Sequence, residues 1–215
     1  MKTRLFSLLT VLTLILAALP AAADQVLYNN GPFDDDTDAW TINFGFVVSD
    51  TFTLASNSTL TGFNFYSWVF PGDVLLSAEV SITSDENGGT IYFDQTLSFA
   101  QSNCVTNAYG FNICLETSST FNGPNLGPGT YWVNLQNATA NTGDPVYWDE
   151  NSGEGCNSPD CPSRASQNSV GTIPSESFSI LGNTGTTTGS VPEPSAFLLF
   201  SSGIMAVAGL LKRRV

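Results

Sequence analysis

Four aspartates near the start of the chain form its densest group of metal-ligating side chains. They are Asp34, Asp35, Asp36 and Asp38, which lie within five positions after Gly31-Pro32. Ca²⁺ takes about six to eight oxygen ligands, and closely spaced carboxylates supply them well. The segment lacks the glycine and the distal glutamate of an EF-hand loop, so a structural calcium site of another kind is one hypothesis. An acidic surface loop is the alternative. Beyond such a Ca²⁺ ion we expect no cofactor.

A second acidic group lies around Asp149 and Glu150, directly after Tyr147 and Trp148. Paired carboxylates are the general acid and base of glycosidases, which makes a glycoside hydrolase one hypothesis. Acids flanked by aromatic rings are also typical of sugar-binding faces. The structural alternative is a strand with solvated acids and core aromatics, because Tyr147 and Trp148 would point to opposite faces of a strand. We expect no catalytic residue and take four residues as candidate glycan contacts: Trp68, Trp148, Asp149 and Glu150.

Composition and charge exclude several classes of function. The 215-residue chain has no histidine, which excludes His-based triads and zinc sites with His ligands. Between residues 24 and 190, eighteen acidic side chains stand against a single basic one, Arg164, so the formal charge of this stretch is −17. Such a charge repels phosphate backbones, and we therefore expect no nucleic-acid partner.

All four cysteines lie in the same central part of the chain, at positions 104, 114, 156 and 161. Three pairings are possible, and we favour Cys104–Cys114 and Cys156–Cys161 because each closes a short local loop. A zinc site is the alternative, but the tight two-residue spacing of a zinc ribbon is missing, as is the Cys-x-x-Cys of a redox enzyme. Two disulfides would fit an oxidising compartment outside the cytosol.

The elements that must position these residues are strands. Short runs of β-branched and aromatic residues recur between turn signals over residues 24–181, and none of this stretch has convincing helical periodicity. The pattern predicts an all-β fold, a single β-sandwich or jelly-roll-like domain, with a barrel as the alternative. The nine expected strands are 42–48, 50–54, 60–68, 74–83, 90–99, 109–115, 130–135, 146–148 and 177–181.

Residues 1–23 have the three parts of a secretory signal peptide. Lys2 and Arg4 precede an apolar run over residues 5–19, and Ala21-Ala22-Ala23 supplies a small-residue cleavage site. A first transmembrane helix is the alternative, but the run is short and ends in Pro-Ala-Ala-Ala. We expect signal peptidase to cut after Ala23 and the body to be exported.

A second apolar run, residues 196–211, lies near the C-terminus. It follows Pro192-Glu193-Pro194 and precedes the basic residues 212–214. Sixteen helical residues span ~24 Å, short of the ~30 Å hydrocarbon core, but snorkelling basic side chains still allow a transmembrane helix. A buried core helix is the alternative, and nothing in a β body requires one. Residues 182–190 have no apolar side chain and should form a flexible linker.

The order of Pro192-Glu193-Pro194, apolar helix and basic cluster resembles the PEP-CTERM sorting tail, over residues 191–215. That resemblance implies export in a bacterium that makes extracellular polysaccharide. It also implies cleavage near the Pro-Glu-Pro motif by an exosortase-type membrane protease, with the inner membrane as a stage of sorting. It implies nothing about the chemistry of the body.

The body itself resembles the exported domains that usually precede such tails, in four segments: 50–55, 67–73, 127–137 and 143–151. This resemblance implies a β-sandwich and carries over no catalytic residue. We therefore expect a non-enzymatic protein of the cell envelope or extracellular matrix, associated with extracellular polysaccharide. A carbohydrate-binding module is the alternative and a hydrolase at Asp149 and Glu150 the third hypothesis. The candidate aromatic platforms for a glycan are Trp40, Trp68, Trp132 and Trp148.

Overall fold

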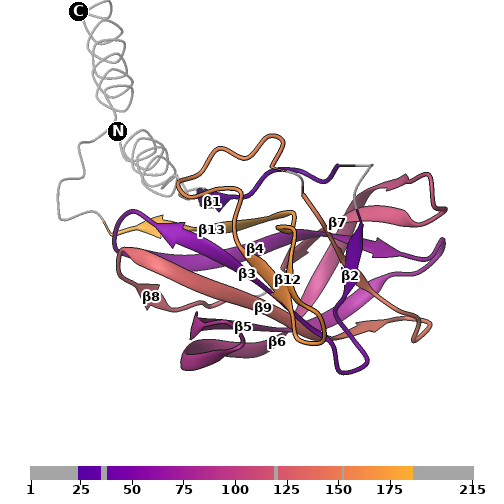
Figure 1. Ribbon diagram of the computed structural model, residues 1–215, viewed down its shortest axis with the longest axis horizontal. Helices are drawn as coiled ribbons and strands as arrows, with labels where there is room; N and C mark the ends of the chain where they lie inside the picture. Colours follow the sequence, from indigo (N-terminus) through magenta and orange to yellow (C-terminus); the bar gives the residue numbers. More distant parts are fainter. Residues whose placement is uncertain (1–23, 35–37, 119–120, 152, 186–215) are drawn as a thin grey trace, which may run out of the picture. The chain divides into compact units, whose positions relative to one another are not determined.

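A computed structural model describes residues 24–34, 38–118, 121–151 and 153–185 of the chain (Figure 1). The predicted signal peptide, 1–23, and the predicted sorting tail, 191–215, lie outside these residues and remain predictions. Within the described ranges, no helix has the length and apolar character needed to cross a membrane.

The described part of the chain is all-β, which confirms the predicted fold class, and its strands pair in antiparallel fashion throughout. The strands are β1 (Gln25–Asn29), β2 (Ala39–Thr41), β3 (Val47–Leu54), β4 (Ser58–Val69), β5 (Leu75–Asp85), β6 (Gly88–Thr106), β7 (Asn112–Ser118), β8 (Asn125–Leu126), β9 (Gly129–Ala140), β10 (Tyr147–Asp149), β11 (Ala165–Gln167), β12 (Gly171–Ile173) and β13 (Phe178–Thr184).

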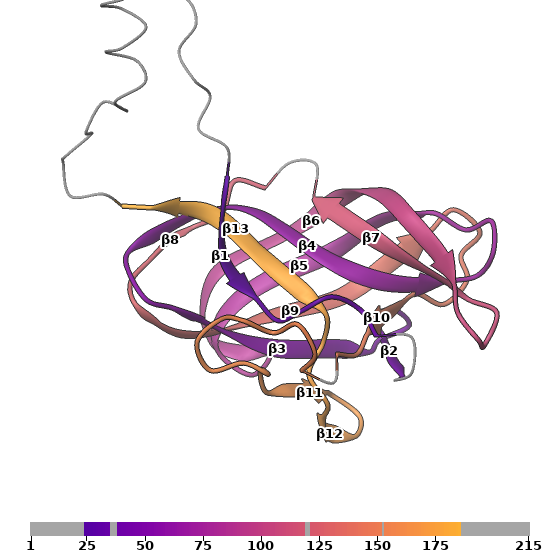
Figure 2. The same cartoon turned by 90° about the horizontal axis from the view of Figure 1, so that it is seen from above.

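The long strand β6 connects the two parts of the sheet. Its first half pairs with β5 and its second half pairs with β7. The strand order is β1-β13-β4-β7-β6-β5-β9-β3-β11-β12, so β4 and β7 lie on one side of β6 and β9 and β3 on the other. The sheet therefore curls around one core in a sandwich-like arrangement, which Figures 1 and 2 show in two views.

Aromatic rings fill the core between the two parts of the sheet. Phe63 and Phe65 are both fully buried on β4, as their alternate spacing predicts. The ring of Trp148 meets them edge to face, with centroids 6.1 and 5.9 Å away. Phe178 on β13 also contacts Trp148, at 5.6 Å between centroids. Strands far apart in the sequence are thus held together by one aromatic cluster.

An irregular pairing changes the inward face of β5. Alternation predicts that Leu76 is buried with Ala78 and Val80, but Leu76 is 48 % exposed. The register of β5 against β9 shifts between Leu75 and Ser77. This shift turns Leu75 into the core in place of Leu76, because one extra residue reverses which side chains face inward.

Two element boundaries also differ from those expected. The strand predicted over 42–48 begins only at Val47, because Phe44 and Gly45 form a turn with φ of 57° and 88°, and it then continues without a break through the predicted strand 50–54 as β3. Strand β13 continues to Thr184, so the predicted linker 182–190 is still strand over its first residues. Backbone pairing with β4 needs no apolar side chain there, which is why composition did not reveal it.

Candidate functional site

The cysteines form the two disulfides that the sequence predicts. Cys104 and Cys114 join β6 to β7, with their Cα atoms 4.1 Å apart. Cys156 and Cys161 close a loop between β10 and β11, with their Cα atoms 6.0 Å apart. The first disulfide therefore crosses the β6–β7 pairing at its register shift between Ser102 and Val105, and the second holds a loop outside the strands.

The four candidate glycan contacts are all in the interior, which corrects their assignment as a surface platform. Trp148 and Asp149 are fully buried, and Trp68 and Glu150 are each 4 % exposed. The indole N–H of Trp148 donates to the carbonyl oxygen of Ser177 at 3.1 Å. The indole N–H of Trp68 donates to a carboxylate oxygen of Asp149. Internal hydrogen bonds therefore engage these polar groups, and a polysaccharide cannot reach them.

Asp149 and Glu150 do not form the paired carboxylates of a hydrolase pocket. Glu150 accepts hydrogen bonds from the indole of Trp40 and from the backbone N–H of Asp38, the latter at 3.3 Å. Neither acid lines the pocket described below. These two buried acids therefore have a structural role: their hydrogen bonds connect the end of β10 to Trp68 on β4 and to Trp40 on β2.

The calcium hypothesis stays a hypothesis. Asp35 and Asp36 lie outside the described residues, while Asp38 lies beside Glu150, whose backbone N–H donates to the Asp38 carbonyl oxygen at 3.0 Å. In the described part of the chain, no group of three or more His, Cys, Asp or Glu side chains is placed to hold a metal ion.

Buried carboxyl groups are an unexpected feature of the interior. Asp50 accepts hydrogen bonds from the backbone N–H groups of Thr51 and Glu176, at 2.6 and 2.7 Å. Burial nevertheless raises the pKa of Asp50 to about 7. Burial, together with the charge of Asp50, raises the pKa of Glu176 well above its usual range. Burial also raises the pKa of Glu116 to about 7. Burial therefore favours the neutral, protonated form of each of these three acids.

An exposed aromatic surface covers Trp68. Its members are Phe70, Tyr109, Phe111 and Tyr147, which we call the aromatic patch. Tyr109 is 67 % exposed and stacks on Trp68, with ring centroids 5.8 Å apart. Phe111 contacts Phe70 at 4.8 Å and Tyr147 at 5.6 Å between centroids. Tyr109 and Phe70 are the exposed members of the patch, whereas Phe111 and Tyr147 are half-buried, so the two exposed rings are available to a ligand above a buried indole.

Hydrogen bonds and a disulfide fix the conformation of the turn that carries Tyr109. This turn replaces the start of the strand that the sequence predicts over 109–115. The side-chain oxygen of Asn107 accepts hydrogen bonds from the backbone N–H groups of Tyr109 and Phe111, both at 3.0 Å. The disulfide between β6 and β7 closes the same hairpin. The aromatic patch is therefore preorganised, which lowers the entropic cost of binding a ligand.

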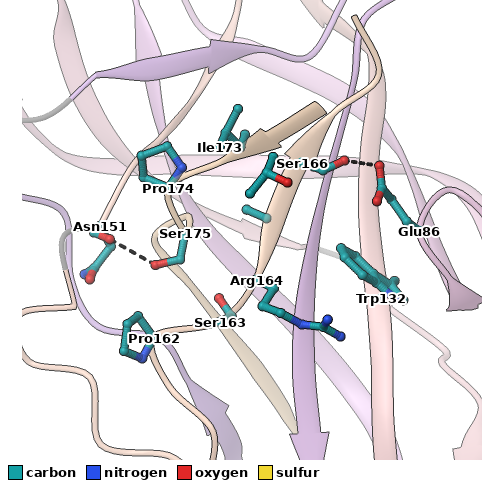
Figure 3. Close-up of a pocket in the computed structure, with 12 residues that line it drawn as sticks. Glu86, Trp132, Asn151, Pro162, Ser163, Arg164, Ser166, Ile173, Pro174 and Ser175 are labelled. Carbon is teal, nitrogen blue, oxygen red and sulfur yellow. Dashed lines mark hydrogen bonds between the residues drawn. The ribbon is translucent and has the colours of Figure 1, made fainter. Parts of the chain in front are cut away.

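A pocket of about 470 Å³ lies at the edge of the sheet formed by β11 and β12. We call it the Trp132 pocket. It is within the size range of small-molecule sites. Figure 3 shows the side chains of Trp132 and Glu86 on one side of it and those of Asn151, Pro162 and Pro174 on the other. Its lining residues are Glu86, Trp132, Asn151, Pro162, Ser163, Arg164, Ala165, Ser166, Thr172, Ile173, Pro174 and Ser175.

The polar groups of the Trp132 pocket are held by specific contacts. The guanidinium of Arg164 lies over the ring of Trp132, 5.8 Å from its centroid. The backbone of Arg164 is fixed by Thr51, whose hydroxyl accepts from the Arg164 N–H at 2.9 Å. The hydroxyl of Ser166 donates to a carboxylate oxygen of Glu86. A cation, a carboxylate and an indole thus converge on one concave surface.

Sequence reasoning found only part of this pocket. Trp132 is one of the four candidate platforms; it is half-buried, and it precedes the fully buried Val133, whose side chain points to the opposite face of β9. Arg164 is marked in the sequence only as the single basic residue of the body. Neither protein-family models nor curated protein sequences give a match to this chain, so its own geometry guides the functional interpretation.

Proposed function

We propose that this chain is a non-enzymatic exported protein of the cell envelope or extracellular matrix, whose β-sandwich body binds extracellular polysaccharide. The carbohydrate-binding module considered from the sequence is the more specific form of the same proposal. The observation that carries it is the aromatic patch. Exposed rings held in a fixed arrangement offer flat apolar surfaces to sugar rings, and here a closed hairpin supports them.

The predicted route of the protein accords with this role. Two disulfides are typical of proteins in oxidising compartments. In the proposal, signal peptidase removes residues 1–23, and an exosortase-type protease acts near Pro192-Glu193-Pro194. In the same proposal, the helix predicted over 196–211 would hold the chain in the inner membrane until then, with the basic residues 212–214 on the cytoplasmic side.

Binding to polysaccharide can be tested by retention of the purified protein on polysaccharide isolated from the producing cells. Tyr109→Ala combined with Phe70→Ala should reduce retention at least tenfold. Tyr92→Ala removes another ring, 40 % exposed on β6, and serves as the matched control with unchanged retention. If the wild-type protein is not retained, or if the double variant is retained as strongly as wild type, the proposal is wrong.

The route can be tested by mass spectrometry of the mature protein from culture. The expected N-terminus is Asp24, and the C-terminus should lie near the Pro-Glu-Pro motif. Replacing Glu193 and Pro194 by alanine should leave the protein uncut and bound to the membrane. Processing of this variant at the wild-type rate would show that the segment is only an ordinary membrane anchor.

A further inference from the structure

The Trp132 pocket combines hydrogen-bond donors, hydrogen-bond acceptors and apolar walls. Arg164 supplies donors only, and Glu86, when ionised, supplies acceptors only. The exposed hydroxyl of Thr172 can serve as both, whereas the side-chain amide of Asn151 is already hydrogen-bonded to the backbone of Pro32, Gly153 and Glu154. The indole of Trp132, Ile173 and two prolines form the apolar part of the lining. A ligand that fits must therefore donate and accept hydrogen bonds in the same small volume while it also presents apolar faces.

Arg164 is available to such a ligand. Among the described residues its guanidinium forms no salt bridge, although acidic side chains are abundant in the body. The Trp132 ring restricts its position through a cation–π contact. The five N–H donors of the guanidinium are fixed in a planar fork, which can reach two neighbouring oxygen atoms of one ligand.

The charge around the pocket disfavours an anionic ligand. Glu86 contributes a carboxylate to the lining itself, and the hydroxyl of Ser166 holds it there. The stretch 24–190 carries eighteen acidic side chains and only the one arginine, and this field repels anions at low ionic strength. A pocket lined by one guanidinium and one carboxylate therefore suits a polar, uncharged ligand better than a ligand that carries a carboxylate.

The geometry points to a second sugar-binding site in this pocket, one that takes an uncharged sugar residue. A neutral sugar has hydroxyl groups that donate and accept, and its ring carries apolar C–H faces, so it meets each requirement of the lining. The neighbouring hydroxyls of the sugar would bind the fork of Arg164, with Glu86 accepting from a hydroxyl and the indole of Trp132 lying against the ring. This inference rests on the proposed polysaccharide-binding function and adds a site apart from the aromatic patch.

The test is a titration of the purified protein with defined sugars, followed by amide chemical shifts in NMR. The probes are the neutral disaccharides cellobiose, maltose and lactose, and the acidic disaccharide digalacturonate. At least one neutral disaccharide should shift the amide signals of residues 163–166 and 172–175 and bind more tightly than digalacturonate. Tighter binding of digalacturonate, or no shift with any neutral probe, would overturn the inference.

Variants separate a binding role from a structural one. Arg164→Gln and Trp132→Phe should each weaken the neutral disaccharide at least fivefold, and Arg164→Lys should also weaken it because the fork is lost. Val170→Ala changes a residue that is 59 % exposed on the β11–β12 turn and is the matched control. If the pocket variants that remain folded bind like wild type, the pocket is not the site.

The two proposals fail in different ways. If the wild-type protein is retained on polysaccharide but the pocket variants bind disaccharides unchanged, the inference about the Trp132 pocket is wrong and the proposed function stands. If a neutral disaccharide binds the pocket while the protein is not retained on the native polysaccharide, the site is real and the proposed partner is wrong.

Discussion

Replacing Glu116 by Gln should change how the stability of the protein depends on pH. Glu116 is fully buried on β7, and burial raises the pKa of its carboxyl to about 7. The hydroxyl of Ser67 donates to one carboxylate oxygen at 2.7 Å and opposes that shift. A glutamine can accept the same hydrogen bond through its amide oxygen, so the variant removes the titration with little change of shape.

The sign of the effect follows from proton binding. In the unfolded chain a glutamate loses its proton near pH 4.5, whereas folded Glu116 keeps it up to about pH 7. Between these values the folded protein binds one more proton than the unfolded chain. The free energy of unfolding therefore falls as pH rises, by ~1.4 kcal/mol per pH unit. Over the whole interval Glu116 lowers the stability by ~3 kcal/mol, and outside it the contribution is constant.

The assay is denaturant-induced unfolding at pH 5, 6, 7 and 8 with the disulfides intact. Relative to wild type, Glu116→Gln should gain ~2–3 kcal/mol in free energy of unfolding between pH 5 and pH 8. Ser67→Ala is the control: it keeps the acid and removes the opposing hydroxyl, so its stability should remain pH-dependent. If wild type and Glu116→Gln lose stability in parallel over this range, folded Glu116 is ionised and the reasoning is refuted.

Three further changes test the architecture. Replacing both Cys104 and Cys114 by Ser should lower the free energy of unfolding by ~3 kcal/mol, because the bond closes a loop between residues 10 positions apart. Denaturant-induced unfolding measures this loss, and an unchanged midpoint would contradict the prediction. Trp148→Ala should lower the free energy of unfolding by ~3–5 kcal/mol because the ring is fully buried, and Trp148→Phe should lower it less. Thermal unfolding of the two variants and the wild type measures the difference. Gly182→Ala should destabilise the β13–β4 pairing, since a Cβ would lie 2.3 Å from the carbonyl oxygen of Thr59, and faster amide exchange in β13 is the expected readout.

Sequence pattern predicts local structure well where one face of a strand is buried and the pairing is regular. Phe63 and Phe65 follow this rule on β4. Leu76 breaks it, because the register shift in β5 depends on the partner strand and leaves no mark on the alternation. The sequence pattern does not reveal β11 and β12 because they are short: pairing with β3 defines β11, and pairing with β11 defines β12.

The candidate site was harder to predict than the fold. Alternation places Tyr147 and Trp148 on opposite faces, but it does not say which face is inside. The structure answers this by burying Trp148 against Phe178 and placing Tyr147 in the aromatic patch, against Phe111. The Trp132 pocket depends on segments that only the tertiary fold brings together, from the β5–β6 turn to the chain after β12. The two disulfides were predictable because each closes a loop that is local in the sequence.

The position of β13 bears on when the protein can fold. This strand lies between β1 and β4, although the ribosome makes it after every other strand described here. Until it emerges, β1 lacks its hydrogen-bonded neighbour and β4 has an open edge. Pairs such as Val26 and Leu181 join opposite ends of the body, and such long-range contacts form slowly. The sheet can therefore be completed only after the whole body has been synthesised, and the pairing of β1 is among the last contacts that can form.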